Sequence, residues 1–124
     1  MLLYPNMKKE TLHGVDGSCQ ISKRHLEAIQ QCISIILQEA FPIEKIVLFG
    51  SCARSQSRYE SDIDLLLIVK ELPSSREIRR LKMKLGDRIG LEVDLKILTA
   101  EAFASSTDFF INNIKRDGVT VWTH

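Results

Sequence analysis

Three aspartates with a distinctive spacing suggest metal-dependent chemistry. Asp62 and Asp64 are separated by one residue, and Asp94 lies within the alternating segment of residues 92–97. Residues i and i+2 of a β-strand point to the same face and lie roughly 7 Å apart. Mg²⁺ is usually held by one or two carboxylates together with substrate phosphates. We therefore predict a magnesium site formed by all three carboxylates, with the Asp94 strand paired beside the strand that carries the other two.

A glycine and a serine upstream of the acids have the pattern of a phosphate-binding turn. Gly50 follows the apolar run 46–49, and the segment 51–54 reads Ser-Cys-Ala-Arg. Glycine lets backbone approach a ligand closely, and the free N–H groups of a short helix attract phosphate. Ser51 adds a hydroxyl donor, and Arg54 either braces a triphosphate or pairs with an acid of the scaffold. The segment lacks the P-loop lysine and the three-glycine dinucleotide fingerprint, which disfavours both of those nucleotide folds.

The aspartates, the Gly-Ser pair and the apolar strands together indicate a nucleotide site more specifically than any one of them alone. A lone Asp-x-Asp also occurs in solvated turns and in unrelated metal enzymes. Here it coincides with the upstream Gly50-Ser51 pair, an apolar strand at 63–69 and an acid inside a second alternating strand. Phosphatases of the haloacid dehalogenase type also use Asp-x-Asp, but their buried strand precedes the acids, whereas this one follows them. The order of strand and acids favours nucleotidyl transfer over that class.

Apolar periodicity predicts the elements that position these residues. A helix is expected from Ser22 until Pro42, and another after the capping-box pattern of Ser74 and Glu77, ending near Gly90. In the third strand the apolar residues should face the core and Asp94 the opposite side. Strands are expected at 45–49, 63–69, 92–97 and 118–122, with a last helix at 100–115. The fold class is therefore α/β (α+β), a small mixed β-sheet flanked by helices.

The combined motif resembles the DNA polymerase β nucleotidyltransferase superfamily, and most closely its minimal nucleotidyltransferases. The similarity covers about residues 22–122. It implies that Asp62 and Asp64 bind two Mg²⁺ ions and that Asp94 completes the catalytic metal site. The same resemblance implies that the turn after the first strand holds the nucleotide phosphates. The two residues that do so are Gly50 and Ser51.

The resemblance also implies an activity and a partner. Members transfer a nucleoside monophosphate, here AMP from ATP, to an acceptor hydroxyl with the help of two Mg²⁺ ions. Small stand-alone members often pair with a helical HEPN protein as the antitoxin of a toxin–antitoxin system, and some transfer AMP to a tyrosine of that partner. The chain departs from the family at Ser55, where Ala-Arg is usually followed by glycine. We therefore expect the turn after the short helix to differ from that of the family.

Two other functions stay open at the level of sequence. A contact-only binding module could neutralise a partner without chemistry, which the intact acids argue against and Ser55 slightly favours. A small-molecule nucleotidyltransferase would need a further wall for its acceptor, which a dimer of the chain could supply. The acceptor, the base preference and the oligomeric state are not determined by these patterns.

Length and composition are consistent with one small enzyme domain. The chain has 124 residues, 44% of them hydrophobic, and a net charge of +1. We expect an N-terminal tail at 1–21 and the nucleotidyltransferase domain at 22–124. The charge gives no broad field for nucleic acid, and no apolar stretch has the length of a membrane helix. Three cysteines without C-x-x-C spacing argue against disulfides and zinc, so we expect a cytoplasmic protein.

Basic residues raise a separate question. Arg76, Arg80, Lys84 and Arg88 form an i, i+4 stripe on the predicted second helix. The stripe could bind an acidic partner or RNA. We favour a solvated helix face, because such stripes are ordinary on amphipathic helices and no aromatic residues are interleaved for bases to stack on. Lys96 shares a strand face with Asp94, where it either contacts phosphate or neutralises its neighbour.

Overall fold

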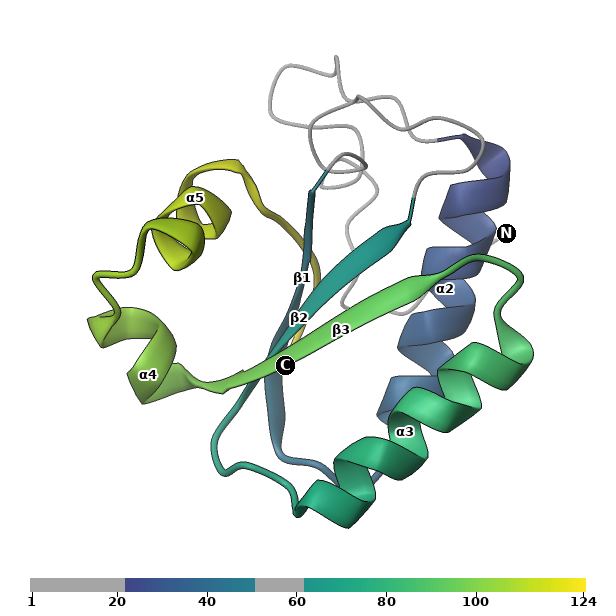
Figure 1. The fold of residues 1–124 in the computed structure, drawn as a ribbon, viewed down its shortest axis with the longest axis horizontal. Helices are drawn as coiled ribbons and strands as arrows, with labels where there is room; N and C mark the ends of the chain where they lie inside the picture. The colour runs from purple at the N-terminus through teal and green to yellow at the C-terminus, as the bar shows by residue number, and fades with distance from the viewer. Residues whose placement is uncertain (1–21, 51–61) are drawn as a thin grey trace.

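The computed structural model describes residues 22–50 and 62–124, so the predicted tail at 1–21 lies outside the described residues. Helices and strands are mixed along the chain, which confirms the predicted mixed fold class (Figure 1). None of the helices in these two segments is long and apolar enough to cross a membrane. The elements are α2 (Lys23–Leu37), β1 (Ile43–Phe49), β2 (Ile63–Val69), α3 (Ser75–Arg88), β3 (Val93–Thr99), α4 (Ala100–Ser105), α5 (Phe109–Asp117) and β4 (Val119–Thr123).

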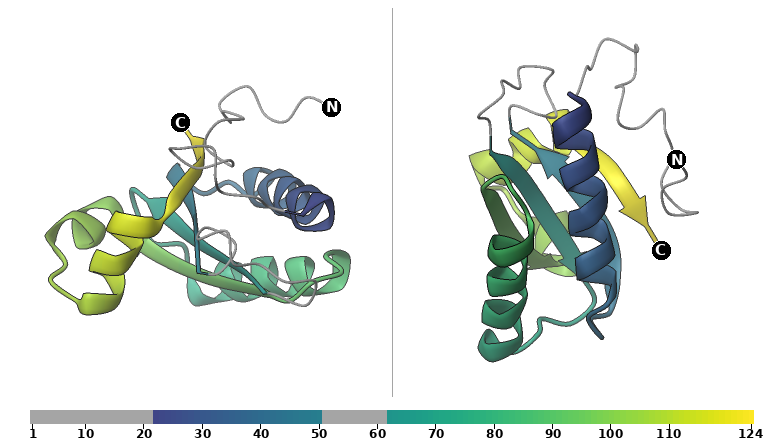
Figure 2. Two further views of the ribbon diagram at one scale, coloured as in Figure 1. Left: turned by 90° about the horizontal axis from the view of Figure 1, so that it is seen from above. Right: turned by 90° about the vertical axis from the view of Figure 1, so that its right-hand side faces the viewer.

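The four strands form one mixed sheet in the order β3-β2-β1-β4. β1 is antiparallel to both β2 and β4, whereas β2 and β3 are parallel. A parallel pair needs a crossover connection, and α3 supplies it. Helices α2 and α3 cover one face of the sheet, and α4 and α5 lie on the other (Figure 2).

Strand β2 is the centre of the core because both of its faces are buried. Its alternate residues 63, 65, 67 and 69 belong to the larger apolar cluster, which includes α2 and α3. Leu66 and Ile68 belong to the smaller cluster with Ile111 and Ile114 of α5. A strand covered on both faces reads as a continuous apolar run, which is the pattern that identified this strand in the sequence. Asp64 alternates in step with Leu66 and Ile68, so its side chain points to the same face of the sheet, the side of α5.

The predicted start and end of α3 are confirmed. Ser74 accepts a hydrogen bond from the Glu77 backbone N–H at 3.1 Å, and the Glu77 carboxylate accepts one from the Ser74 N–H at 3.0 Å. The hydrogen bonds of the Glu77 carboxylate with the Ser74 backbone N–H and, second, with the Ser74 side chain lower the pKa of Glu77. The helix ends at Arg88, with Ile89 as its C-cap, one residue before Gly90. The capping box therefore marked the start of this helix correctly.

The prediction of one last helix over 100–115 is wrong. The chain forms α4 and α5 instead, separated at residues 106–108. The Ser106 hydroxyl accepts a hydrogen bond from the Asp108 N–H at 3.1 Å, and the Asp108 carboxylate accepts one from the Ile111 N–H at 3.3 Å. Side chains that bond to nearby backbone in this way compete with helical hydrogen bonds and favour a new N-terminus.

The interpretation of the basic stripe needs a correction. Arg80 Nε lies 3.6 Å and Lys84 Nζ 3.4 Å from the carboxylate of Glu39, whose side chain is only 6% exposed. Two of the four cations therefore pair with an acid between α2 and β1 and tie α3 to that loop. Arg76 and Arg88 are exposed, as the solvated-face interpretation predicts.

Truncation of Leu66 to alanine should destabilise the fold strongly, because this side chain of β2 is fully buried between the sheet and α5. We expect a loss of about 2–5 kcal/mol in the free energy of unfolding, measured by urea denaturation. Leu72→Ala is the matched control, since Leu72 is 59% exposed and its truncation should change stability by no more than about 0.5 kcal/mol. Equal losses in the two variants would contradict the two-faced burial of β2.

Candidate active site

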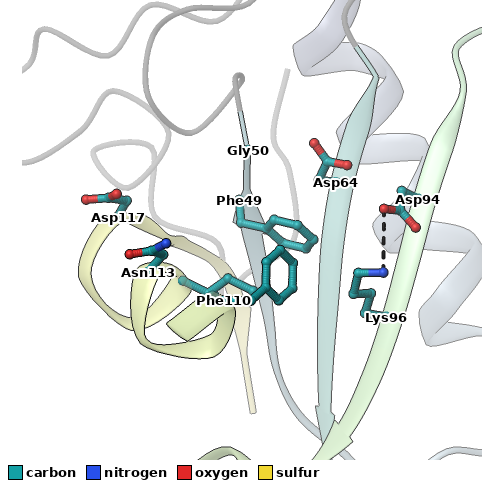
Figure 3. Close-up of a pocket in the computed structure, with 9 residues that line it drawn as sticks. Phe49, Gly50, Asp64, Asp94, Lys96, Phe110, Asn113 and Asp117 are labelled. Carbon is teal, nitrogen blue, oxygen red and sulfur yellow. Dashed lines mark ion pairs between the residues drawn. The ribbon is translucent and has the colours of Figure 1, made fainter. Parts of the chain in front are cut away.

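A pocket of about 440 Å³ lies where β1 ends and where β2 and β3 begin, between the sheet and α5 (Figure 3). The strands contribute carboxylates and a cation, and the helix contributes an aromatic ring and polar groups. Its size is within the range of small-molecule sites, roughly 300–1,000 Å³. The lining residues are Phe49, Gly50, Asp64, Asp94, Lys96, Phe110, Asn113, Ile114 and Asp117.

Asp64 and Asp94 are direct register partners across the parallel β2–β3 pair. Neighbouring strands lie about 4.8 Å apart, so the two carboxylates start from adjacent positions on one face of the sheet. Both line the pocket, and Leu95 between Asp94 and Lys96 is buried on the opposite face. The expectation that the Asp94 strand pairs beside the Asp64 strand is therefore confirmed.

Asp62 is placed differently from the other two acids. It precedes β2 by one residue, is exposed, and is not among the described residues that line the pocket. In the segments 22–50 and 62–124, no group of three or more His, Cys, Asp or Glu side chains is arranged to hold a metal ion. Asp64 and Asp94 alone offer two adjacent carboxylates. This oxygen-only set fits Mg²⁺, which takes its remaining ligands from water and substrate phosphates.

Gly50 is required by the position of Asp64. Its φ is +77°, a conformation that residues with a side chain rarely adopt. A Cβ atom at this position would stand 3.0 Å from Cγ of Asp64 and closer still to its Oδ2. Any side chain here would therefore displace the carboxylate. The other residues of the predicted phosphate turn, Ser51 and Arg54, lie outside the described residues, as does Ser55.

Helix α5 forms the second wall of the pocket. Phe110 packs edge-to-face on Phe49, with ring centroids 5.6 Å apart and an interplanar angle of 89°. Arg116 donates hydrogen bonds to Asn113 at 3.0 Å and to Asp117 at 3.1 Å, and the bond to Asp117 raises the pKa of Arg116. The Phe110 contact joins α5 to β1, whereas the Arg116 hydrogen bonds lie within α5 and hold the polar side chains of its C-terminal end.

The sequence did not identify this wall. Residues 110, 113, 114 and 117 share one face of α5 at spacings of three and four, and that periodicity was the available signal. Phe110 is 40% exposed and lines the pocket.

Lys96 is the cation that lies beside Asp94 in the pocket. Its Nζ lies 3.8 Å from Oδ2 of Asp94 and 5.8 Å from the centre of the Phe110 ring. The side chains of both ion-pair partners are about half exposed, at 45% and 51%. A pair this exposed contributes little to stability.

A known family and a curated relative each match most of the chain. The polymerase beta nucleotidyltransferase family model covers residues 30–123. MJ0141 of Methanocaldococcus jannaschii, named as a candidate protein adenylyltransferase, is 31% identical over 96 residues. The matched segment covers 77% of this chain and 94% of that relative.

Solved structures share the fold. A chain from a crystal structure of a toxin–antitoxin with AMP-PNP superposes with a TM-score of 0.62 and 19% identity, over 83% of this chain and 75% of that chain. A chain from a complex of tri-AMPylated Shewanella oneidensis HEPN toxin with MNT antitoxin gives a TM-score of 0.58 and 20% identity, over 82% and 73% of the two chains. At these identities the likeness shows the fold.

Gly50→Ala should destabilise the protein and weaken divalent-cation binding, because the added Cβ strains the backbone and collides with Asp64. We expect a loss of about 1–3 kcal/mol in the free energy of unfolding, together with weaker Mn²⁺ binding in an electron paramagnetic resonance titration. Gly86→Ala is the control, because its Cβ meets nothing within 4 Å and the residue lies in the last turn of α3. This second change should stabilise the protein by roughly 0.5–1 kcal/mol. Normal Mn²⁺ binding by the Gly50 variant would contradict the proposed dependence of Asp64 on Gly50.

Proposed function

The chain belongs to the polymerase β nucleotidyltransferase family, and from that premise we propose that it transfers AMP from ATP to a hydroxyl of a protein partner in a Mg²⁺-dependent reaction. The observation that carries this proposal is the direct pairing of Asp64 with Asp94 at a pocket closed on one side by Gly50. Family membership supplies the reaction class, and the carboxylate pair supplies the chemistry that the class requires. The relatives' names support adenylyl transfer as the particular reaction.

Each residue has a distinct part in this proposal. Asp64 and Asp94 would hold Mg²⁺ with Asp62 nearby, and the bound metal would neutralise phosphate charge and activate the acceptor oxygen. Gly50 gives the backbone its approach to the phosphates. Ser51 and Arg54 are proposed to contact those phosphates. The acceptor oxygen forms a bond to the α-phosphorus and its proton passes to solvent. The bond between the α-phosphorus and the oxygen that bridges to the β-phosphate breaks, and pyrophosphate leaves, so no protein nucleophile is needed.

A helical HEPN-type protein is the acceptor that we propose, with this chain as the antitoxin of the pair. Solved structures of the same fold are complexes of this kind, one of them containing a tri-AMPylated HEPN toxin. Phe109 supports a protein acceptor, because its side chain is 78% exposed beside Phe110 at the start of α5. Exposed aromatic side chains are frequent anchors of protein interfaces. A partner that docks here would bring a hydroxyl close to the pocket.

Incubation of a native-host lysate with α-³²P-labelled ATP and Mg²⁺ tests this function. The unmodified protein should label a protein acceptor, and Asp64→Asn or Asp94→Asn should reduce the labelling at least about 100-fold, because each change removes a metal ligand from the transition state. Asp87→Asn is the matched control, since this exposed acid lies on α3 away from the pocket.

Equal labelling by the Asp64→Asn, Asp94→Asn and Asp87→Asn proteins would overturn the proposed chemistry. Neutralisation of a purified helical partner without any labelling would instead identify the chain as a contact-only module. Label found only in a small molecule would identify a small-molecule nucleotidyltransferase.

A further inference from the structure

Lys96 lies between two groups that can each hold its ammonium. Asp94 is on one side at 3.8 Å, and the ring of Phe110 is on the other at 5.8 Å. We propose that Lys96 changes partner during the reaction cycle. It neutralises Asp94 before the metal binds, and then turns to the triphosphate of the substrate. This inference rests on the proposed nucleotidyl transfer and assigns a role to a residue outside its carboxylate set.

The position of Lys96 in the sheet allows this movement. β3 is at the edge of the sheet that the described residues form, so within them its exposed side chains have no neighbouring strand on one side. Lysine has a long flexible stem that carries a compact charge, and an exposed ion pair breaks at little cost. The ammonium lies over the Phe110 ring at the same time as it faces Asp94, so it keeps a favourable contact within the pocket when it leaves the carboxylate. Lys96 can therefore leave Asp94 and stay in the site.

The charges of the pocket provide the reason for the exchange. Among the lining residues that the structure describes, Lys96 is the single Lys or Arg, against three aspartates. Asp117 accepts hydrogen bonds from Arg116. Lys96 is therefore the cation that lies beside Asp94. A divalent ion on Asp94 repels an ammonium at this distance, whereas a triphosphate attracts it. Metal and substrate therefore move Lys96 in the same direction.

The proposal predicts opposite effects of one substitution on two ligands. Lys96→Met keeps the stem and removes the charge. Mn²⁺ affinity of the nucleotide-free protein should rise about two- to fivefold, because a competing cation is gone. Affinity for a non-hydrolysable ATP analogue in the presence of Mg²⁺ should fall about tenfold, because a charge-assisted contact to phosphate is lost. Electron paramagnetic resonance and isothermal titration calorimetry measure the two constants.

Lys115→Met is the matched control for this experiment. Lys115 also lies over a phenylalanine, 5.3 Å from the centre of the Phe103 ring, but it does not line the pocket. Its substitution should leave both affinities unchanged. Lys96→Arg keeps the charge and should restore most of the analogue affinity. Circular dichroism of every variant shows whether the fold is intact.

Three results would overturn the inference. Unchanged affinities for Mn²⁺ and the analogue in folded Lys96→Met would show that Lys96 affects the binding of neither ligand. A rise in Mn²⁺ affinity with unchanged analogue affinity would limit Lys96 to neutralising Asp94. If the unmodified protein binds neither Mn²⁺ nor the analogue, the proposed function fails as well. Acceptor labelling by the unmodified protein together with unchanged Lys96→Met affinities would remove the inference alone.

Discussion

The parallel pairing of β2 with β3 is the constraint on which the rest of the site depends. It places Asp64 opposite Asp94, and it is held because β2 is covered by apolar contacts on both faces. A slip of one residue in such a strand would turn every side chain to the other face. The apolar residues of β2 would then exchange clusters, and Asp64 would point into the core beneath α2 and α3. The core therefore fixes the register that the proposed chemistry requires.

The same constraint explains why an acid is tolerated within a buried strand. Asp64 is the single charged residue of β2 and stands one position inside its start. At that position the covering helix α5 leaves a pocket instead of a packed contact. Gly50 on the neighbouring strand end contributes no side chain, so the carboxylate has room beside the backbone. Strand, helix and turn together make a polar space at the rim of an apolar sheet.

Sequence patterns predicted those features that local physics determines. The apolar run of β2, the alternation around Asp94 and the capping box at Ser74 were sufficient for the elements they define. The break at 106–108 was missed because Ser106 and Asp108 hydrogen-bond to nearby backbone, which apolar periodicity does not report. Contacts between distant segments were also missed. Glu39 and Lys84 meet although they are 45 residues apart, and α5 forms the pocket wall only once the sheet exists. The roles of Asp62, Ser51 and Arg54 remain predictions from the sequence.

The position of β3 at the edge of the sheet has a consequence for association between molecules. An edge strand presents unpaired backbone groups that can accept a strand from another chain, and charged side chains oppose such pairing. Asp94 and Lys96 are exposed charges on this strand. The residues proposed to act on the nucleotide thus also lie where charge opposes the pairing of this edge with another strand. We expect a homologue that loses the activity to keep charges at these positions, or to cover the edge in another way, because an uncharged exposed edge favours pairing between chains.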